Sequence, residues 1–510
     1  MNKKIPYIYL LIFITVAFGL FYNLDDRLLW GDEAETAVLA YNITKWGVPK
    51  TTDGKNIITL LGLRQDSNEN EIWIWSPWLD EYLAAASFIL FGKNTFAARF
   101  PFVLVALFTV PFFVFTVRRI YHNPELTLTA TLLYVTNVAF LLHSRQCRYY
   151  SLIIFAQIWL IFGYQRLMEG HSKKGVFHLI CALTIQYYCN YIIVIGNILS
   201  LGVSALLVYR RHDRLLRQIF YCFSAFAILA VPWLLYARPW HQSGNVTINN
   251  FIDNLIYYFM ETHFHIVPLI LLLIPLIMFF RKSKTQKTAL KFAAVKDVEI
   301  FLWMLLPCHM FVLCMLTSIF FRYSIPLIPV LIILVSMILV RFITSRFLRY
   351  TLIILLCFSN IISVLSAFPI RGKHQFGMPF FLFLREITSN YQDQLEDVVS
   401  FLKDNANSKQ SILVADPEFP LIFYTDMRII DARFKRSSKK IDFPEWIFTE
   451  SASGVAQGKM RVPDSILRMY QPVMLEVHDT RRGASRPSPH FHVPFTAPNK
   501  KKMLLYKRFS

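Results

Sequence analysis

Long apolar runs recur along the chain from Pro6 to about residue 368, separated by short polar segments, and then stop. Because a helix needs roughly 20 consecutive apolar residues to cross a bilayer, this pattern predicts about eleven membrane spans. No acidic or basic residue is expected in the middle of any span. The expected spans are residues 5–22, 97–117, 125–142, 149–167, 175–190, 191–209, 218–236, 264–280, 298–318, 324–341 and 350–368. The predicted fold class is a polytopic α-helical membrane protein with about eleven transmembrane helices.

Two long polar segments stand apart from these runs. Residues 24–96 form a loop after the first span, and two amphipathic runs within it, 33–46 and 79–91, are expected to lie on the membrane surface. From about residue 370 the pattern changes to short alternating helix and strand signals, with strands expected at 411–415, 473–477 and 503–506. The predicted domains are therefore a transmembrane domain, 1–369, and a C-terminal soluble α/β domain, 370–510.

Charge gives the orientation of the spans. The net charge is +20, and its clusters of Lys and Arg lie in the short gaps that follow every second span. Cationic loops stay in the cytoplasm, so the amino terminus is predicted inside, and the first loop and the C-terminal domain outside. This placement argues against a nucleic-acid-binding face. The expected location is the plasma (inner) membrane, which the chain crosses many times.

Aromatic and sulfur-containing residues add little chemistry. Trp73, Trp75 and Trp78 fit an aromatic belt at the membrane surface. The seven cysteines lie in or beside apolar runs without metal-ligand spacing, so neither a disulfide framework nor a cysteine metal site is predicted. His263 and His265 are two positions apart and do not share a helix face, which favours packing over metal binding. No cofactor is indicated with certainty, and a divalent metal is left open.

The most informative polar stretch is Trp30-Gly-Asp-Glu-Ala-Glu, which follows the first span. Asp32 can cap the helix that follows, with Glu35 as its capping-box partner. Alternatively, a carboxylate at the outer membrane surface can act as the general base toward an acceptor hydroxyl. The spacing allows both interpretations. Asp80 and Glu81, which open the second amphipathic run, are interpreted as a helix-start acid pair.

Arginine occurs twice where the orientation rule disfavours it, in short outer loops before the fourth span and before the tenth. Each site is followed by tyrosine. A guanidinium forms paired hydrogen bonds to phosphate oxygens, and tyrosine rings can flank a sugar or a polyprenyl chain. The alternative to phosphate binding is that these arginines extend their side chains to the membrane surface, next to tyrosines of an interfacial aromatic belt. The candidate binding residues are Arg145, Arg148, Tyr149, Tyr150, Arg322 and Tyr323.

Taken together, these stretches resemble the GT-C membrane glycosyltransferases. The resemblance rests on four stretches in order along the chain. They are the Gly-Asp-Glu-Ala run with its downstream residues to Pro49, residues 77–92 with Ala98-Arg99, residues 144–152, and Arg322-Tyr323 with Pro326 and Pro329. Within that class the chain is similar to dolichyl-phosphate-mannose protein mannosyltransferases and bacterial aminoarabinose lipid A transferases.

The resemblance implies an inverting transfer of a hexose or pentose from a polyprenyl-phosphate donor to a protein, lipid or glycan acceptor outside the cytoplasm. By position, Asp32 and Glu33 match the catalytic acids, and the three arginines hold the carrier phosphate. The implied partners are the lipid-linked donor, the acceptor and membrane lipid, with no nucleic acid. A transporter or flippase of a lipid-linked sugar is the alternative. Because transporters usually carry ionisable residues inside their spans, the enzyme is favoured.

Overall fold

The computed structural model describes residues 5–60, 66–212, 214–242, 247–281, 296–367, 376–389, 392–414, 418–431, 443–450, 460, 462–478 and 499–509. The chain folds into two compact units. The bundle unit consists of Met1–Tyr22, Phe102–Arg145 and Tyr149–Leu384. The sheet unit consists of Asn23–Pro101, Gln146–Arg148 and Arg385–Ser510.

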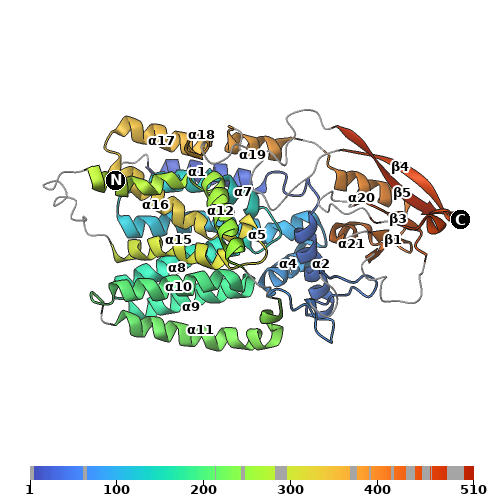
Figure 1. Ribbon diagram of the computed structural model, residues 1–510, viewed down its shortest axis with the longest axis horizontal. Helices are drawn as coiled ribbons and strands as arrows, with labels where there is room; N and C mark the ends of the chain where they lie inside the picture. The colour runs from blue at the N-terminus through green and yellow to red at the C-terminus, as the bar shows by residue number, and fades with distance from the viewer. Residues whose placement is uncertain are drawn as a thin grey trace. The chain divides into compact units, whose positions relative to one another are not determined.

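The bundle unit is built from apolar helices, several of which pack side by side along their length (Figure 1). Its helices are α1 (Ile5–Phe21), α5 (Thr95–Tyr121), α6 (Pro124–Val135), α7 (Val138–Ser144), α8 (Tyr150–Met168), α9 (Ser172–Cys189), α10 (Tyr191–Val208), α11 (Leu215–Ala237), α12 (Ile248–His265), α13 (Ile274–Arg281), α15 (Asp297–Cys314), α16 (Leu327–Phe342), α17 (Arg346–Phe358), α18 (Ile361–Ala367) and α19 (Pro379–Thr388). Short 3-10 turns join some of them, namely η1 (Pro239–Gln242), η2 (Leu269–Leu273) and η3 (Phe321–Ser324). α5 and α19 each contain residues of both units.

Five helices of the described chain are each long and apolar enough to cross a bilayer, namely α5, α8, α10, α11 and α15. Three helix pairs qualify as bent spans, with bends of 54° between α6 and α7, 99° after α12 and 94° between α17 and α18. Tyr7–Phe21 and Leu327–Phe342 are shorter apolar helices. The fold is thus that of a multi-pass helical membrane protein. The count of about eleven spans stays a prediction.

Polar side chains explain two of these bends. Asn137 starts α7 inside a predicted span, because its side chain accepts a hydrogen bond from the backbone N of Phe140 (3.0 Å). His263 holds the bend after α12. Its Nδ1 accepts a hydrogen bond from the backbone N of Leu269 (3.1 Å), and its Nε2 lies 3.0 Å from the carbonyl oxygen of Ser363. Apolar periodicity alone does not reveal such breaks.

The segment between the spans predicted at 218–236 and 264–280 contains a helix. Residues 248–265 form α12 there, and the location of this segment outside the membrane stays a prediction. Thr247 caps this helix, since its Oγ1 accepts a hydrogen bond from the backbone N of Asn250 (3.3 Å). α12 is amphipathic, so it lacks the continuous apolar run by which a span is recognised.

Four buried polar side chains form one hydrogen-bonded network inside the bundle. Gln186 donates to Gln157 (3.0 Å), and Asn197 donates to Gln186 (2.6 Å). The Nε2 of His309 lies 2.9 Å from the side-chain oxygen of Asn197. His309 lies inside α15, which corrects the expectation that the spans contain no basic residue. In a low-dielectric interior such a network holds α8, α9, α10 and α15 in one packing register.

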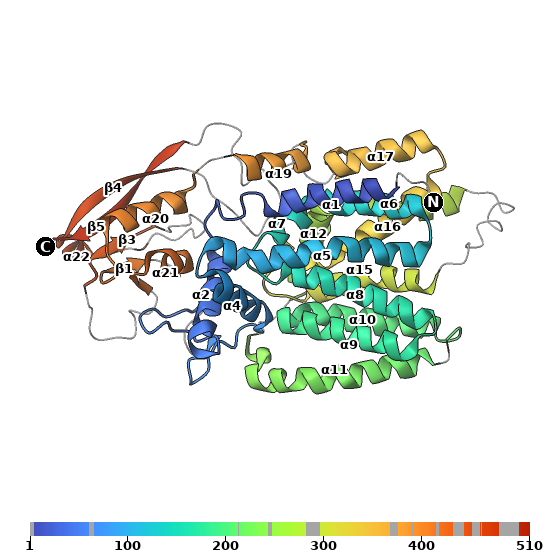
Figure 2. The same cartoon turned by 180° about the vertical axis from the view of Figure 1, so that it is seen from behind.

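The sheet unit contains a five-stranded sheet in the order β2-β1-β3-β5-β4. β1 is parallel to β2 and β3, whereas β5 is antiparallel to β3 and β4. α20 packs against β4 (Figure 2). The elements of the unit are α2 (Gly31–Trp46), α4 (Leu79–Phe91), α20 (Gln394–Asn405), β1 (Ser411–Val414), α21 (Phe419–Thr425), β2 (Arg428–Asp431), β3 (Trp446–Phe448), α22 (Asp464–Leu467), β4 (Tyr470–His478) and β5 (Lys500–Arg508). The three strands predicted from the sequence are therefore present, although Ala415 lies outside the described residues.

Hydrogen bonds join the long first loop to the C-terminal strands within this unit. The side chain of Asn56 accepts from the backbone N of Ile429 (2.7 Å) and donates to the carbonyl of Met427 (3.2 Å), beside the edge strand β2. The hydroxyl of Tyr424 accepts from the backbone N of Leu29, two residues before α2 begins (2.9 Å). A separate C-terminal domain at 370–510 stays a prediction, since residues 385–510 and 23–101 belong to one unit.

The two amphipathic runs of the first loop form α2 and α4, as predicted, and the two helices pack against each other. One of the three tryptophans between them differs from the prediction. Trp73 is 0% exposed, and its indole nitrogen donates to the Ser76 hydroxyl (2.9 Å). The assignment of Trp73 to a membrane-surface belt is therefore wrong, because its ring belongs to the core of the loop.

Candidate active site

α2 begins next to the predicted catalytic acids. Its N-cap is Trp30, whose backbone N donates to the Oε2 of Glu33 (3.4 Å). Asp32 is the second residue of the helix, so the interpretation of Asp32 and Glu35 as a capping pair is wrong. Asp32 is partly exposed and lies in the first turn, where the helix dipole favours negative charge. The general-base interpretation of Asp32 stays a prediction.

Glu33 lies in a buried ion pair with Arg99. The Nε of Arg99 donates to Oε1 of Glu33 (2.9 Å), and its Nη2 donates to Oε2 (2.7 Å). Glu33 is 1% exposed, and its Oε1 also accepts from the backbone N of Cys147 (2.8 Å). Paired hydrogen bonds between two charged groups are among the strongest in proteins. This geometry suits a residue that positions the start of α2.

Arg99 was not singled out as a site residue from the sequence, although it holds the chain in front of α2. Its Nη1 donates to the carbonyls of Leu24 (3.0 Å) and Arg27 (2.8 Å), and its Nη2 donates to the carbonyl of Leu28 (3.2 Å). The Ala98-Arg99 element of the GT-C resemblance was the one signal that could have found it. Through these bonds one side chain fixes both Glu33 and the segment that leads into the helix.

Arg148 contacts the first turn of the same helix. Its Nη1 donates to the carbonyl of Asp32 (3.1 Å) and to the hydroxyl of Thr36 (2.8 Å). The same nitrogen lies 3.2 Å from Oε1 of Glu35, with both side chains largely buried. Arg148 therefore places a positive charge beside Asp32. Its guanidinium is shared with Glu35, which the phosphate-binding hypothesis from the sequence did not include.

A second acid pair lies at the start of α4. Glu81 is 1% exposed, and Asp80 beside it is 2% exposed. Burial raises the pKa of Glu81 well above its usual range, the neighbouring Asp80 raises it further, and Arg148 lowers it by a smaller amount. The helix-start interpretation explains the position of these acids but not their burial. The raised pKa of Glu81 means that burial in the sheet unit favours its protonated form.

Replacing Glu81 by Gln should make the protein more stable at alkaline pH. The folded state keeps a proton on Glu81 that the unfolded state loses, so stability falls as the pH rises from the ordinary glutamate value toward the raised one. Each unit of the shift corresponds to about 1.4 kcal/mol, and glutamine removes this loss. Thermal unfolding of Glu81→Gln and wild type between pH 4 and pH 9 checks this. The exposed Glu69→Gln serves as the control, and a constant difference across the pH range would refute the assignment.

Arg145 caps the C-terminal end of α1 within the bundle unit. Its Nη1 donates to the carbonyls of Gly19 and Leu20, both at 2.9 Å, and its Nη2 donates to the carbonyl of Tyr22 (2.9 Å). The last carbonyls of a helix lack partners within the helix and attract cations. This contact gives a structural reason for an arginine at a position that the orientation rule disfavours.

The variant Arg145→Ala should therefore lose stability rather than donor affinity. Removing a cation from a helix C-terminus costs up to about 2 kcal/mol. Thermal unfolding and equilibrium binding of a polyprenyl-phosphate analogue, measured on the same preparation, separate the two roles. Weakened binding at unchanged stability would return Arg145 to the phosphate-binding set.

Tyr149 and Tyr150 belong to an aromatic cluster of the bundle unit. Both are buried, their rings lie 4.8 Å apart, and the Tyr149 hydroxyl accepts from the side-chain amide of Asn190 (3.1 Å). The ring of His143 lies 5.0 Å from Tyr150 and 5.8 Å from Phe321. The cluster therefore brings the Tyr-Tyr pair together with η3, the second of the two predicted arginine sites.

Arg322 and Tyr323 lie in η3. The guanidinium carbon of Arg322 is 4.1 Å from the centre of the Phe320 ring and 5.8 Å from that of Tyr323. A guanidinium stacks on aromatic rings through its flat face, while the N–H groups lie along its edge. The backbone N of Phe320 donates to the hydroxyl of Tyr258 (3.3 Å), which fixes the start of the turn. The stack on Phe320 restricts the Arg322 guanidinium, and its role as a phosphate ligand stays a prediction.

Metal ligands do not gather in the described part of the chain. No group of three or more His, Cys, Asp or Glu side chains is arranged to hold a metal ion there. His265 lies 3.6 Å from Glu261, and its ring packs on Phe321 with centres 5.5 Å apart. His265 accordingly forms part of the aromatic cluster.

Comparisons with known proteins give a fold but no sequence relative. No protein-family model and no curated protein sequence matches the chain. Among solved structures, apo ArnT from Cupriavidus metallidurans matches with a TM-score of 0.55 and 12% identity over 93% of each chain. ArnT bound to undecaprenyl phosphate matches with a TM-score of 0.51 and 14% identity, over 92% of this chain and 93% of that one.

A more distant match points to the same fold class. The apo oligosaccharyltransferase from Archaeoglobus fulgidus matches with a TM-score of 0.50 and 11% identity, over 85% of this chain and 65% of that one. ArnT and this oligosaccharyltransferase are both GT-C glycosyltransferases. The chain therefore has a GT-C fold similar to that of ArnT, as its sequence resemblance indicated.

Proposed function

We propose that the protein is a membrane glycosyltransferase that moves a hexose or pentose from a polyprenyl-phosphate donor to a protein, lipid or glycan acceptor outside the cytoplasm. The observation that carries this proposal is the likeness to ArnT over 92% of the chain in a structure that holds undecaprenyl phosphate. A polyprenyl phosphate is the leaving group that such a donor releases. The same proposal puts Lys173 in the cytoplasm and Glu450 outside it, as the positions of the cationic loops favour.

Asp32 is the proposed general base. It lies in the first turn of α2 and is partly exposed. Its neighbour Glu33 is buried against Arg99, which supports a positioning role for Glu33 rather than direct contact with substrate. A helix start held by Glu33, Arg99 and Arg148 gives Asp32 a fixed direction, which general-base catalysis requires.

The proposed reaction is one displacement with inversion at the anomeric carbon. The acceptor oxygen bonds to that carbon while its proton passes to Asp32. The bond from the anomeric carbon to the phosphate oxygen breaks, and its electron pair stays on the polyprenyl phosphate. Positive charge develops on the sugar ring and negative charge on the leaving oxygens. Cations beside those oxygens therefore lower the barrier.

Arg322 is the proposed principal ligand of the carrier phosphate, with Tyr323 beside it and the pair Tyr149 and Tyr150 in the adjoining cluster. Its stacking on Phe320 supports this role, because the ring restricts the orientation of the guanidinium. Arg148, already shared with Glu35, is proposed to supply positive charge near Asp32. Arg145 is proposed to act structurally, through the end of α1.

The variant Arg322→Ala should bind the donor about ten- to a hundredfold more weakly, the loss expected for a charge-assisted contact to phosphate. Binding of a fluorescent polyprenyl-phosphate sugar to the purified protein checks this. Arg217→Ala, an exposed arginine on α11, is the matched control and should bind like wild type. Equal affinity in Arg322→Ala and wild type would remove Arg322 from the site.

A flippase for the lipid-linked sugar is the competing function. It would carry the donor across the bilayer with the sugar–phosphate bond intact. The glycosyltransferase releases free polyprenyl phosphate in proportion to glycosylated product. Mass spectrometry of the lipid fraction after incubation therefore separates the two functions, and transport without release would favour the flippase.

A further inference from the structure

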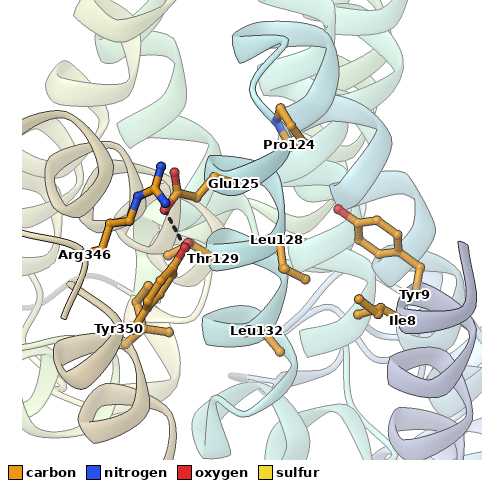
Figure 3. Close-up of a pocket in the computed structure, with 10 residues that line it drawn as sticks. Ile8, Tyr9, Pro124, Glu125, Leu128, Thr129, Leu132, Arg346 and Tyr350 are labelled. Carbon is orange, nitrogen blue, oxygen red and sulfur yellow. Dashed lines mark hydrogen bonds between the residues drawn. The ribbon is translucent and has the colours of Figure 1, made fainter. Parts of the chain in front are cut away.

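The bundle unit contains a pocket whose lining includes none of the residues assigned to sugar transfer. It lies between α1, α6 and α17, and Figure 3 shows α6 between the other two helices. Its volume is ≈ 380 Å³, within the range of about 300 to 1,000 Å³ that is usual for ligand sites. The lining residues from α6 are Pro124, Glu125, Leu128, Thr129 and Leu132, and those from the other helices are Ile8, Tyr9, Arg346, Tyr350 and Ile353.

The polarity of the pocket changes along the helix axes. On α6, Glu125 lies in the first turn, whereas Leu128 and Leu132 follow one and two turns further into the bundle. On α17, Arg346 is the first residue, and Ile353 lies two turns further on. The pocket therefore has a charged mouth and an apolar interior, a pattern that suits an amphiphile rather than a small water-soluble anion.

The mouth carries unbalanced positive charge. Glu125 is neutralised by Arg349, with 2.7 Å between the charged atoms, and it also accepts a hydrogen bond from the Tyr350 hydroxyl (3.2 Å). Arg346 is exposed, and it forms no ion pair or hydrogen bond with any described residue. An anionic head group is therefore the complementary ligand.

Two of the helices that line the pocket, α17 and α1, also carry large apolar side chains that are exposed. Phe347 on α17 is 83% exposed, Ile354 is 58% exposed, and Leu11 on α1 is 66% exposed. In a multi-pass membrane protein, apolar surfaces of this kind face lipid chains. A ligand can accordingly enter sideways from the bilayer, with its chain ahead of it and its head group left at the mouth.

We propose that this pocket binds an anionic membrane phospholipid, with its phosphate at Arg346 and one acyl chain along Leu128, Leu132 and Ile353. The site is distinct from the donor site and does not depend on sugar transfer. Arg346 follows the span predicted at 324–341, in a cationic segment that is predicted to face the cytoplasm. The cytoplasmic leaflet is rich in anionic lipid, and basic pockets between membrane helices bind such head groups.

The test uses the full chain in detergent and adds phosphatidylglycerol or zwitterionic phosphatidylcholine, each with a photoreactive acyl chain. We expect phosphatidylglycerol to label peptides of α6 and α17 several-fold more strongly than phosphatidylcholine. Arg346→Gln should reduce this labelling about fivefold, the effect of one cation near an anionic head group. Leu128→Trp should abolish it by filling the pocket while every charge stays in place.

Two controls make the result decisive. Arg217→Gln removes an exposed charge from α11, and it should label like wild type. Unchanged thermal unfolding of each variant shows that lost labelling reflects binding rather than folding. Equal labelling by both lipids, an equal loss in Arg217→Gln, or label outside α1, α6 and α17 would overturn the proposal. Preferential displacement by polyprenyl phosphate would overturn it as well, since that outcome assigns the pocket to the carrier.

Discussion

The variant Asp32→Asn should lose sugar transfer by a factor of about a hundred to ten thousand, the contribution of a general base. Asparagine has nearly the same shape as aspartate, and it keeps a side-chain oxygen but not the basicity. Because Trp30 rather than Asp32 is the N-cap, the substitution leaves the helix start intact. Transfer rate, donor binding and thermal unfolding, all measured on purified protein, check this expectation.

Donor binding and unfolding serve as internal controls for this variant. Both should stay close to wild type, because Arg322 and the buried contacts of Glu33 are unaffected. Wild-type transfer by Asp32→Asn would eliminate Asp32 as the base. A combined loss of transfer and stability would instead identify Asp32 as a structural residue, and the catalytic assignment would fall with it.

The variant Glu33→Gln should be strongly destabilised, by about 3 to 5 kcal/mol, since it leaves Arg99 buried without its negative partner. The two side chains are 1% and 10% exposed, so water cannot replace the lost charge. Thermal unfolding in detergent measures the effect. Transfer should fall because less protein is folded, and the rate per folded molecule should change less than in Asp32→Asn.

A surface ion pair of the same unit provides the matched control. Lys93 and Asp426 lie 3.3 Å apart, with the Asp426 side chain 77% exposed. Asp426→Asn should cost no more than about 1 kcal/mol, as exposed pairs do. If Glu33→Gln were as stable as Asp426→Asn but inactive, Glu33 would be a direct participant in the reaction.

The apolar pattern predicted most of the helices of the bundle but not their breaks. Apolar runs mark where a span is favourable, and that depends only on composition over about 20 residues. The bend at Asn137 depends on one side chain capping a new helix, and the bend after α12 depends on His263 reaching Ser363, a hundred positions away. Such long-range hydrogen bonds leave no periodic signal in the sequence.

In the candidate site, too, some features were predictable from the sequence and others were not. The presence of Asp32 in the first turn of a helix was predictable, because acids cluster at helix starts, whereas its role as a base stays a prediction. The contact of Arg145 with the end of α1 was not predictable, since an arginine bound to the carbonyls of a helix and one bound to phosphate look alike in a sequence. Trp73 is a similar case, because indole rings suit both a membrane surface and a buried core.

Arg99 and the Gln157 network were missed for a further reason. The expectations from the sequence used Lys and Arg near span ends as orientation signals and included no role for polar amides inside the spans. Once buried, charged and amide side chains need hydrogen-bond partners, because a buried polar group without partners costs free energy. In the structure Arg99 bonds to Glu33 and three carbonyls, and Gln157 bonds to Gln186 and Asn197.

Sugar transfer by the purified protein from a synthetic polyprenyl-phosphate donor tests the central claim most directly. A donor of known anomeric configuration is incubated with envelope extract as the source of acceptor, and the products are analysed by mass spectrometry and NMR. The account predicts equal amounts of glycosylated product and free polyprenyl phosphate, with the anomeric configuration inverted. No release of polyprenyl phosphate in the presence of bound donor, or a product that retains the donor's configuration, would contradict it.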